Sequence, residues 1–528
     1  MDSVGFVCAT GLILGLSYIK SLAPSKPLSP APPSASSHAP LLPPGARGPL
    51  QVFSLSRLPD IGRTYPSPLK TRLGWTLPGE MVLTSQFAGR DALVEAACGG
   101  PRPCRAEGAS GGGGAPPQEA LAVVWDALKW AESKAPLVLP DNSLRAFQRG
   151  GPHGALAFDP ATARAAIVTC GGLCPGLNTV VRELVMCLHY TYNVGTIWGI
   201  RGGYQGFYST DVDWLKLTPD VVSEIHNEGG TMLGSSRGGF DAKTDVDRDR
   251  ILDMLAGGRR ETAGAPVNML FVVGGDGTQR GASRLGRGAL QRGIRLGVAG
   301  VPKTIDNDIP LVDKTFGFDT AVEEAVRPIH CANVEAKAAP NGVGVVKLMG
   351  RDAGFIALYA AMASRVANLV ILPEKRWGMG NLIKWLAARL EKKGHAVIVV
   401  AEGADTSCIE LEGELLALKE AKAKGTAAKD ASGNLLHARD VGLYLKDEIG
   451  KHFGSPEAPK NGTRGASVKY IDPSYIIRSS PPCASDSNLC TTLAYDAVHG
   501  VFAGFTDLCV PGGRVVGEGR PAPFLAAP

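Results

Sequence analysis

The chain has 528 residues, of which 44% are hydrophobic and 20% are charged, and its formal net charge is only +5. This length and apolar content are enough to bury the cores of two or more globular domains. Because the 55 basic residues are scattered among 50 acidic ones, the charge pattern gives no reason to expect a nucleic-acid partner. The 11 cysteines form no Cys-x-x-Cys pair, which argues against a zinc ribbon and against a disulfide framework.

Residues 1–50 are predicted to be a targeting or disordered leader. The apolar stretch 4–19 is shorter than the roughly 20 residues of a membrane span, and no Lys or Arg precedes it as in a secretory signal. A run rich in Pro, Ser and Ala follows at 21–44. Residues 3–59 contain no Asp or Glu, which fits an organelle transit segment as well as a disordered leader. Plastid and cytoplasm therefore stay open as locations, and no membrane partner is expected.

The rest of the chain divides into an extension, a core and a tail. Residues 51–160 are expected to form an N-terminal extension with a Gly/Pro-rich linker at 98–117. Residues 161–515 show the alternating rhythm of an α/β core, and residues 506–528, rich in Gly and Pro, form an atypical C-terminal tail. Six short β-branched runs predict buried parallel strands: AAIVTC, TIWGI, MLFVVG, RLGVAGV, GVGVVKL and AVIVVAEG. Ligands are expected just after these runs, because they gather at the carboxyl ends of parallel strands.

The first strand ends in TCGGLCPGLN, and a helix is predicted from about Thr179. Gly171 and Gly172 let backbone N–H groups approach phosphate oxygens at a helix N-terminus, although a Gly pair after a strand also makes a simple tight turn. The third strand ends in VVGGDGTQRGA. Its Asp276 is placed to hold Mg²⁺ beside a triphosphate, and the structural alternative is a cap of the following helix.

The next strand runs into VPKTIDNDIP, which places Lys303, Asp306 and Asp308 on one short turn. Two carboxylates beside a lysine suit phosphoryl transfer: one can take a hydroxyl proton, the other can act on a metal or a charge, and the lysine neutralises phosphate oxygens. Solvated loop charges are the alternative. This turn is the sequence feature that points most directly to chemistry.

Later strands end in groups that suit a sugar phosphate. VKLMGRDAGFIALYAAMAS offers an arginine that can clamp a phosphate in a bidentate manner, and AVIVVAEG ends in a glutamate that can accept hydrogen bonds from sugar hydroxyls. KYIDPSYIIRS adds basic and phenolic groups, although tyrosine in a β-rich run often only packs. The residues concerned are Met349, Gly350, Arg351, Glu402, Lys469, Tyr470, Tyr475 and Arg478.

Eight motifs, in order and spacing, closely resemble those of 6-phosphofructokinases over about residues 140–505: TCGGLCPGLN, GGTMLGSSRGGFD, GGDGTQRGA, PKTIDNDIP, FGFDTAVEEA, VKLMGRDAGFIA, VAEGA and YIDPSYIIR. The segments FQRGGPHGALAFDP and ASGN resemble the plant-type, ATP-dependent branch. The resemblance implies two Rossmann-like three-layer α/β domains with the active site in the cleft between them. It also implies an allosteric enzyme of glycolysis that uses Mg²⁺ and ATP to phosphorylate fructose 6-phosphate, as a homo-oligomer of two or four subunits.

By this resemblance, Asp306 is the general base, Arg351 and Thr304 stabilise the transferring phosphoryl group, and Asp276 holds Mg²⁺ with Asp308 in the same charge cluster. The implied ATP contacts are Gly171, Arg237, Gly238, Gly275, Asp276, Gly277, Thr278 and Lys303. The implied sugar-phosphate contacts are Thr304, Ile305, Asp306, Met349, Gly350, Arg351, Glu402, Tyr475, Ile476, Ile477 and Arg478.

The phosphoryl donor needs a separate argument, because the family also has pyrophosphate-dependent members. These typically carry Asp at the position of Gly277 and Lys at that of Lys303, whereas bacterial ATP enzymes carry Gly at both. Gly277 removes a side chain and a charge that would collide with the α-phosphate of ATP, so ATP is favoured. The alternatives are pyrophosphate as donor, a non-catalytic regulatory subunit, and a kinase of NAD or lipid. The stretch after Phe505 departs from the usual family ending, which puts stability rather than chemistry in question.

Overall fold

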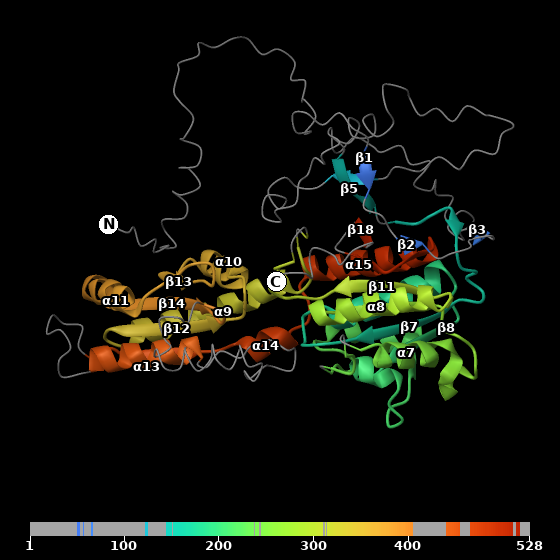
Figure 1. The fold of residues 1–528 in the computed structure, drawn as a ribbon. Helices are drawn as coiled ribbons and strands as arrows, with labels where there is room; N and C mark the ends of the chain where they lie inside the picture. The colour runs from blue at the N-terminus through green and yellow to red at the C-terminus, as the bar shows by residue number, and fades with distance from the viewer. Residues whose placement is uncertain are drawn as a thin grey trace, which may run out of the picture.

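The computed structural model describes residues 151–236, 238–241, 244–309, 312, 314–404, 440–454 and 465–510, together with strand segments at 50–52, 56–57, 65–66, 122–124, 144–149 and 514–517. The predicted ATP contact Arg237, the linker at 98–117, the ASGN segment and all of the leader except Leu50 lie outside the described residues. Two lobes lie side by side, with β7 and α8 in one lobe and β12 and α13 in the other (Figure 1).

The N-terminal lobe contains a ten-stranded sheet with the order β1-β5-β18-β17-β11-β10-β7-β8-β9, in which β4 also pairs with β5. Its centre is parallel, and the register pairs Phe271 with Ile167 on one side and with Ala299 on the other. The parallel strands at the centre are β7 (Arg164–Thr169), β8 (Thr196–Ile200), β10 (Met269–Gly274), β11 (Gly297–Pro302) and β17 (Leu508–Cys509). The edge strand β9 (Leu215–Lys216) pairs with β8 in the antiparallel direction. The shorter strands are β1 (Leu50–Val52), β2 (Ser56–Arg57), β3 (Tyr65–Pro66), β4 (Ala122–Val124), β5 (Leu144–Arg149), β6 (Ala155–Leu156), β16 (Phe505–Thr506) and β18 (Arg514–Gly517).

Helices cover both faces of this sheet because both faces of its central strands are apolar. Ile167 packs in one core with α5 and α15, whereas its neighbour Val168 packs in the opposite core with α7 and α8. These helices are α5 (Leu177–Met186), α7 (Val246–Asp253), α8 (Asp276–Gln291) and α15 (Ala484–Phe502). Short helices complete the lobe: η2 (Cys187–Thr191), η3 (Gly203–Phe207), α6 (Pro219–Val222), η4 (Ile225–Asn227), η5 (Met254–Gly258) and η6 (Arg260–Thr262).

The C-terminal lobe repeats the three-layer plan with a four-stranded parallel sheet of order β13-β14-β12-β15. Val346 and Val399 face a core with α9 and α10, and Val345 and Ile398 face a core with α11 and α13. The strands are β12 (Gly342–Leu348), β13 (Leu369–Ile371), β14 (His395–Ala401) and β15 (Val468–Ile471). The helices are α9 (Phe318–Ala338), α10 (Phe355–Ser364), α11 (Met379–Lys393), α13 (Val441–Gly454) and α14 (Ser474–Ser479).

The predicted α/β class and all six predicted strands are confirmed. The first helix begins at Leu177, two residues before the predicted start, because Gly176 takes a φ of 97° that ends the preceding turn. Within the described part of the chain, no helix is long and apolar enough to cross a membrane.

The C-terminal stretch that departs from the family pattern contributes to the sheet. Leu508 pairs with Ala299 of β11 in parallel register. The hydroxyl of Thr506 accepts the N–H of Val298 at 3.0 Å and donates to the carbonyl of Leu296 at 3.1 Å. Residues 505–510 therefore support the strand that leads into the predicted catalytic turn.

Candidate active site

The turn after β11 is held by hydrogen bonds between its own residues. The hydroxyl of Thr304 donates to Oδ1 of Asp308 at 2.9 Å and accepts the backbone N–H of Asp306 at 3.2 Å. Asn307 has a φ of 56°, and its side-chain oxygen accepts the N–H of Thr315 at 2.9 Å. Thr304 and Asn307 thus fix the backbone on both sides of Asp306, so its carboxylate is positioned before any ligand binds.

Asp306 lies where the two lobes meet. The backbone N–H of Arg351, from the C-terminal lobe, approaches its Oδ2 at 3.5 Å. Its Oδ1 is buried and has no hydrogen-bond partner among the described residues. Burial, and then the charges of Asp308 and Glu402, raise the pKa of Asp306 to about 7, although Arg351 acts in the opposite direction. A buried carboxylate with one unused oxygen and a pKa near neutrality has the properties of a general base.

The N-terminus of α8 places the Gly-rich turn beside β11. Asp276 begins the helix and forms an ion pair with Arg280 at 2.6 Å. Burial first, and then Asp308, raise the pKa of Asp276, whereas Arg280 opposes the shift. Asp276 and Asp308 are therefore close enough to interact electrostatically.

Sequence reasoning missed Gln279 and Tyr204, two residues that hold this turn. The buried amide of Gln279 donates to the carbonyls of Gly274 at 3.0 Å and Val301 at 2.9 Å. It therefore ties together the ends of β10 and β11, and the hydroxyl of Tyr204 donates to the carbonyl of Thr278 at 2.7 Å. The signal available in the sequence was a glutamine directly after the Gly-rich turn, too ordinary to single out.

Gly277 and Gly171 leave space in the predicted nucleotide region. A Cβ atom built at Gly277, in the first turn of α8, would meet no atom of the described residues within 4 Å. Gly171 has a φ of 85°, and a Cβ atom there would lie 3.8 Å from Nζ of Lys303. The backbone N–H of Gly171 donates to the carbonyl of Ser236 at 3.2 Å, and Gly238 has a φ of 94°. Predicted ATP contacts from three separate loops thus lie close together.

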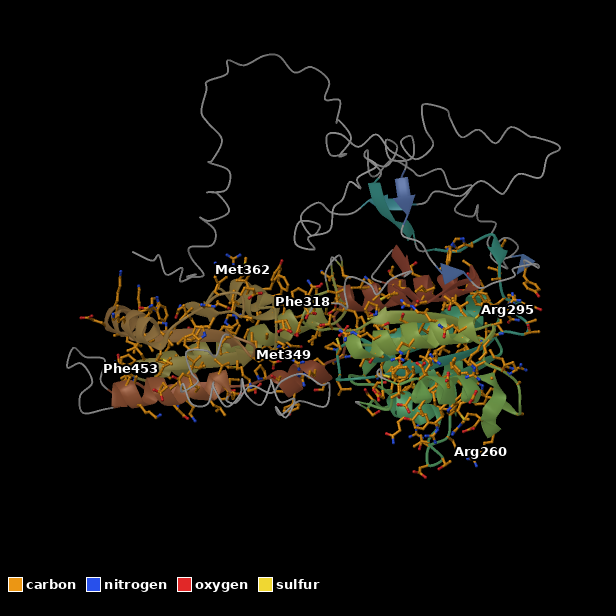
Figure 2. The ribbon with its side chains drawn as sticks, viewed as in Figure 1. Arg260, Arg295, Phe318, Met349, Met362 and Phe453 are labelled. Carbon is orange, nitrogen blue, oxygen red and sulfur yellow. The ribbon has the colours of Figure 1, made fainter. Side chains whose placement is uncertain are left out.

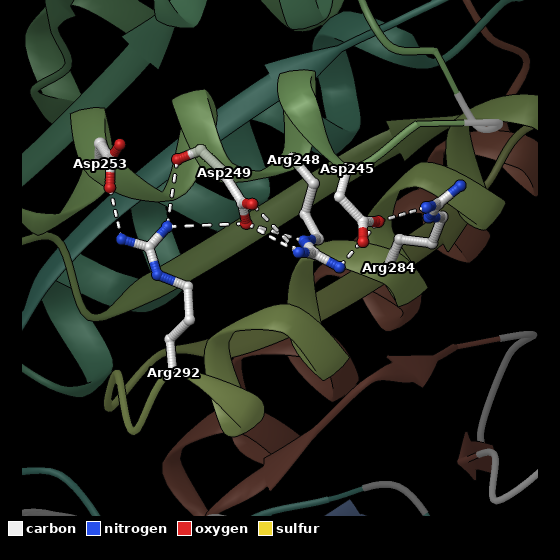
Figure 3. A network of polar contacts seen from close by, with 6 residues as sticks. All are labelled: Asp245, Arg248, Asp249, Asp253, Arg284 and Arg292. Atoms are coloured by element: carbon white, nitrogen blue, oxygen red, sulfur yellow. Dashed lines mark hydrogen bonds and ion pairs between the residues drawn. The ribbon is translucent and has the colours of Figure 1, made fainter.

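An ionic network on the far side of α8 ties this helix to α7 (Figure 3). Asp245 forms ion pairs with Arg284 at 2.5 Å and with Arg248 at 2.8 Å. Arg248 also contacts Asp249 at 2.9 Å, and Arg292 contacts both Asp249 and Asp253. A Cβ atom at Gly288 of α8 would lie 2.6 Å from the side chain of Arg248, so glycine permits the close packing of the two helices.

In the C-terminal lobe, the end of β14 holds the end of β12. The N–H of Glu402 donates to the carbonyl of Leu348 at 2.8 Å, and the N–H of Gly403 donates to that of Gly350 at 3.0 Å. Gly350 has a φ of 124°, and a Cβ atom at Gly403 would lie 1.5 Å from the carbonyl oxygen of Arg351. The ends of β12 and β14, with residues 349–351 and 402, are therefore joined by backbone hydrogen bonds.

The predicted residues of α14 have different surroundings in the structure. Nε of Arg478 lies 3.3 Å from Sδ of Met349, which brings this arginine to the end of β12. Tyr475 and Ile476 are 83% and 67% exposed. Ile477 is 0% exposed in the core of the C-terminal lobe, and its N–H donates to the carbonyl of Pro473, so the structure does not support its prediction as a ligand contact.

Three other residues that the sequence predicts for the sugar-phosphate site differ in their surroundings. Ile305 is partly buried against the cores of both lobes. Lys469 is exposed, and the hydroxyl of Tyr470 donates to Oδ1 of Asp440 at 3.3 Å. Figure 2 shows Met349 near the middle of the molecule, on the side of its lobe that faces the N-terminal lobe.

Comparison with known proteins agrees with this geometry. The phosphofructokinase family model matches residues 164–501. The chain is 46% identical over 367 residues to ATP-dependent 6-phosphofructokinase 7 of Arabidopsis thaliana, covering 68% of each protein. It is 43% identical over 361 residues to ATP-dependent 6-phosphofructokinase of Entamoeba histolytica, covering 68% of this chain and 76% of the relative. The pyrophosphate-dependent phosphofructokinase structure from Nitrosospira multiformis has a TM-score of 0.51 at 18% identity, covers 66% of this chain and 78% of that one, and supports the fold. The chain belongs to the phosphofructokinase family.

Proposed function

We propose that this protein transfers the terminal phosphoryl group of ATP to the 1-hydroxyl of fructose 6-phosphate, giving ADP and fructose 1,6-bisphosphate in glycolysis. The observation that carries the proposal is the position of Asp306, whose buried carboxylate has one unused oxygen at the junction of a phosphate-type site and a sugar-phosphate-type site. Relatives named ATP-dependent 6-phosphofructokinase, at 42–46% identity in plants, support the same reaction.

Asp306 is the general base in this proposal. As the 1-hydroxyl oxygen forms its bond to the γ-phosphorus, its proton passes to Oδ1 of Asp306 and the bond between phosphorus and the β,γ-bridging oxygen breaks. A pKa of about 7 suits this task, because the group is then partly ionised at neutral pH and basic enough to accept the proton. Phosphoryl transfer otherwise depends on positioning and on charge stabilisation.

Arg351 and Thr304 stabilise the phosphoryl group during transfer. Gly403 packs against the carbonyl of Arg351, the N–H of Arg351 approaches Asp306, and the charge of Arg351 lowers the pKa of Asp306, so its guanidinium group lies within electrostatic reach of the base. Thr304 holds the turn through Asp306 and Asp308. A guanidinium group near the transferred oxygens neutralises charge that is spread over them in the transition state.

The carboxylates near α8 fit Mg²⁺. This ion is usually held by one or two carboxylates, substrate phosphates and water, so a dedicated cage is not required. Burial first, and then the charge of Asp308, raise the pKa of Asp276, so the two carboxylates are close enough to interact, as a shared cation would require. Bound Mg²⁺ would neutralise charge on the β- and γ-phosphates, while Asp276 and Asp308 hold it beside the Gly-rich turn.

ATP is the favoured donor because the fold does not need a glycine at position 277. Helical glycine costs about 1 kcal/mol relative to alanine, and no described atom occupies the space of a Cβ atom there. The open space therefore suits a ligand rather than protein packing. Lys303, whose Nζ lies near Gly171, would then neutralise ATP phosphates, while Gly171 leaves room for them and the backbone of Gly238, Gly275 and Thr278 would bind them.

The sugar phosphate would lie against the C-terminal lobe. Met349, Gly350, Arg351, Glu402 and Arg478 belong to one connected unit, which supports their assignment as contacts. Tyr475 and Ile476 are exposed on the same helix as Arg478, and Ile305 packs against the cores of both lobes, so these three residues would border the sugar phosphate.

We also propose that the enzyme is an allosteric homo-oligomer, a dimer or tetramer, and that it acts in a plastid or in the cytoplasm. The family resemblance supports the first statement. Two of the Arabidopsis relatives carry the word chloroplastic in their names, and the acid-poor leader supports a plastid for this chain. Light scattering of the full chain and localisation of a tagged precursor test these points.

A coupled assay of the full chain tests the proposed function. Fructose 6-phosphate and Mg²⁺ are supplied with either ATP or pyrophosphate, and formation of fructose 1,6-bisphosphate is measured. We expect turnover with ATP alone. Turnover with pyrophosphate alone would mean that Lys303 rather than Gly277 decides the donor, and an inactive chain would favour a regulatory subunit.

A further inference from the structure

A buried lysine joins three elements of the C-terminal lobe. The side chain of Lys347, in β12, is only 12% exposed. Its ammonium group forms an ion pair with Asp472 at 2.8 Å and a second, shorter one with Asp440. The hydroxyl of Tyr470 in β15 donates to Asp440 as well, at 3.3 Å. One cation therefore connects residues that are 93 and 125 positions away in the chain.

Both aspartates also accept hydrogen bonds at the starts of helices. Oδ1 of Asp440 accepts the N–H of Leu443 at 2.9 Å in the first turn of α13. Oδ1 of Asp472 accepts the backbone N–H of Ser474 at 3.1 Å and its hydroxyl at 2.6 Å, at the start of α14. Lys347 therefore binds the carboxylates that fix the first turns of two helices, and moving Lys347 should move both.

The three elements pack closely around Lys347. A Cβ atom at Gly442, in the first turn of α13, would lie 2.4 Å from the ring of Tyr470 and 3.1 Å from Cβ of Lys347. Burial alone would lower the pKa of Lys347, but its hydrogen bonds with Asp440 and Asp472 hold that pKa above the usual value. The lysine therefore stays charged and acts as a permanent anchor. Its removal would leave two half-buried carboxylates without their counter-charge.

The anchored elements carry the predicted sugar-phosphate contacts. Lys347 is two residues before Met349 on β12, and Asp472 fixes the first turn of the six-residue helix α14. Arg478, in the last turn of α14, meets Met349 at 3.3 Å. Met349 directly follows β12 and Arg478 belongs to α14, and Lys347 connects these two elements.

We propose that Lys347 is a positioning residue for the sugar phosphate: by holding Asp440 and Asp472 it fixes α14, and with α14 the side chain of Arg478, against the end of β12. Lys347 does not touch the substrate in this proposal. The inference rests on the proposed function, because Arg478 is there a contact of fructose 6-phosphate. It predicts that loss of the anchor weakens the use of one substrate and spares the other.

The test compares Lys347→Met with Lys347→Arg in the full chain, with kcat and the KM values for fructose 6-phosphate and ATP measured separately. We expect Lys347→Met to raise the KM for fructose 6-phosphate about tenfold and to leave the KM for ATP within about twofold. Lys347→Arg keeps the charge, so its KM for fructose 6-phosphate should stay close to that of the wild type. Lys451→Met, which removes an exposed ion pair with Glu448 on α13, is the matched control and should change neither KM.

Each outcome decides the inference. Equal changes in both KM values, or no change in a folded Lys347→Met protein, would overturn it. If Lys347→Met does not fold, Asp472→Asn decides: this variant keeps an oxygen for Ser474 but loses the ion pair, and an unchanged KM for fructose 6-phosphate would overturn the inference. A wild-type chain without turnover would overturn the proposed function and the inference together, whereas an active wild type with an unmoved KM overturns only the inference.

Discussion

The helices that carry the two halves of the candidate site are held in different ways. α8, on the nucleotide side, is tied to α7 by ion pairs whose aspartates are largely open to solvent: the side chains of Asp245, Asp249 and Asp253 are 43–57% exposed, while that of Arg248 is 16% exposed. α14, on the sugar-phosphate side, is tied to β12 through Lys347, which is 12% exposed.

This difference in exposure predicts a difference in sensitivity. Exposed ion pairs contribute about 0–1 kcal/mol each, so α8 must owe its position mainly to packing, such as that at Gly288. Breaking a buried ion pair costs several times more, about 3–5 kcal/mol, because a charge is left without its partner. α14 has only six residues and is held by a partly buried pair, in which Lys347 is 12% exposed and Asp472 is 32% exposed, so the cost of breaking it lies between these two ranges. Substitutions that remove a charge should therefore affect the sugar-phosphate side, and substitutions that fill space should affect the nucleotide side.

The largest expected effect comes from Asp306, which belongs to both sides. Asp306→Asn removes the proton acceptor but keeps the shape of the side chain, so kcat should fall by about 10³-fold while the binding of ATP and fructose 6-phosphate changes little. Steady-state kinetics and calorimetric binding measure the two effects separately. A variant that keeps more than a tenth of its kcat would contradict the role of Asp306 as base.

Gly277→Asp should affect the nucleotide side alone. The new carboxylate would enter the open space beside the Gly-rich turn and repel phosphates, so the KM for ATP should rise about 100-fold while that for fructose 6-phosphate stays within about threefold. An acidic residue in the first turn is favourable for a helix, so the melting temperature should not fall. Gly277→Ala is the control for size without charge. Equal effects from Ala and Asp would show that volume rather than charge decides the donor.

Asp306→Asn should also stabilise the fold in a pH-dependent way. The folded pKa of about 7 lies above the usual unfolded value, so the contribution of Asp306 to stability is present in acid and is lost as the pH rises toward 7. The variant should match the wild type near pH 4 and exceed it by about 2 kcal/mol in unfolding free energy at pH 8. Thermal unfolding at the two pH values provides the comparison. A variant that is less stable than the wild type at pH 8 would contradict the burial argument.

The smallest expected effect concerns the surface network of Figure 3. Arg284→Ala removes one exposed partner of Asp245 and should lower the unfolding free energy by about 0.5 kcal/mol, with the KM for ATP within about twofold. The KM for ATP, measured at low and at high salt, shows how much the remaining exposed ion pairs contribute to the position of α8. A tenfold change in the KM for ATP would show that α8, like α14, is positioned by charge, and the contrast between the two sides would not hold.

The sequence predicted what depends on neighbouring residues and missed what depends on distant ones. The strands were predictable because a parallel strand covered on both faces is a continuous apolar run, as in MLFVVG. The turn at Asp306 was predictable because its charged residues lie within six positions of one another. Arg478 was predicted by resemblance, but its approach to Met349 depends on the packing of α14.

The anchors of the site were not predictable in the same way. Lys347 is a visible irregularity, a charge in the buried run GVGVVKL, and such a charge requires partners. Its partners Asp440 and Asp472 come from distant segments that only the folded sheet brings together. Gln279 similarly acts on a carbonyl of β11 that lies across the sheet from its own turn.

The central claim is that Asp306, with its buried Oδ1 and a raised pKa, is the base, and the pH dependence of kcat/KM for fructose 6-phosphate tests it most directly. The account predicts that kcat/KM falls about tenfold per pH unit below an apparent pKa of about 7, which forms the acid limb of the pH profile. Asp306→Glu should shift this acid limb, whereas the titration of the substrate phosphate should stay in place. A limb near pH 4, the range of an ordinary carboxylate, or one that Asp306→Glu leaves unmoved, would contradict the account.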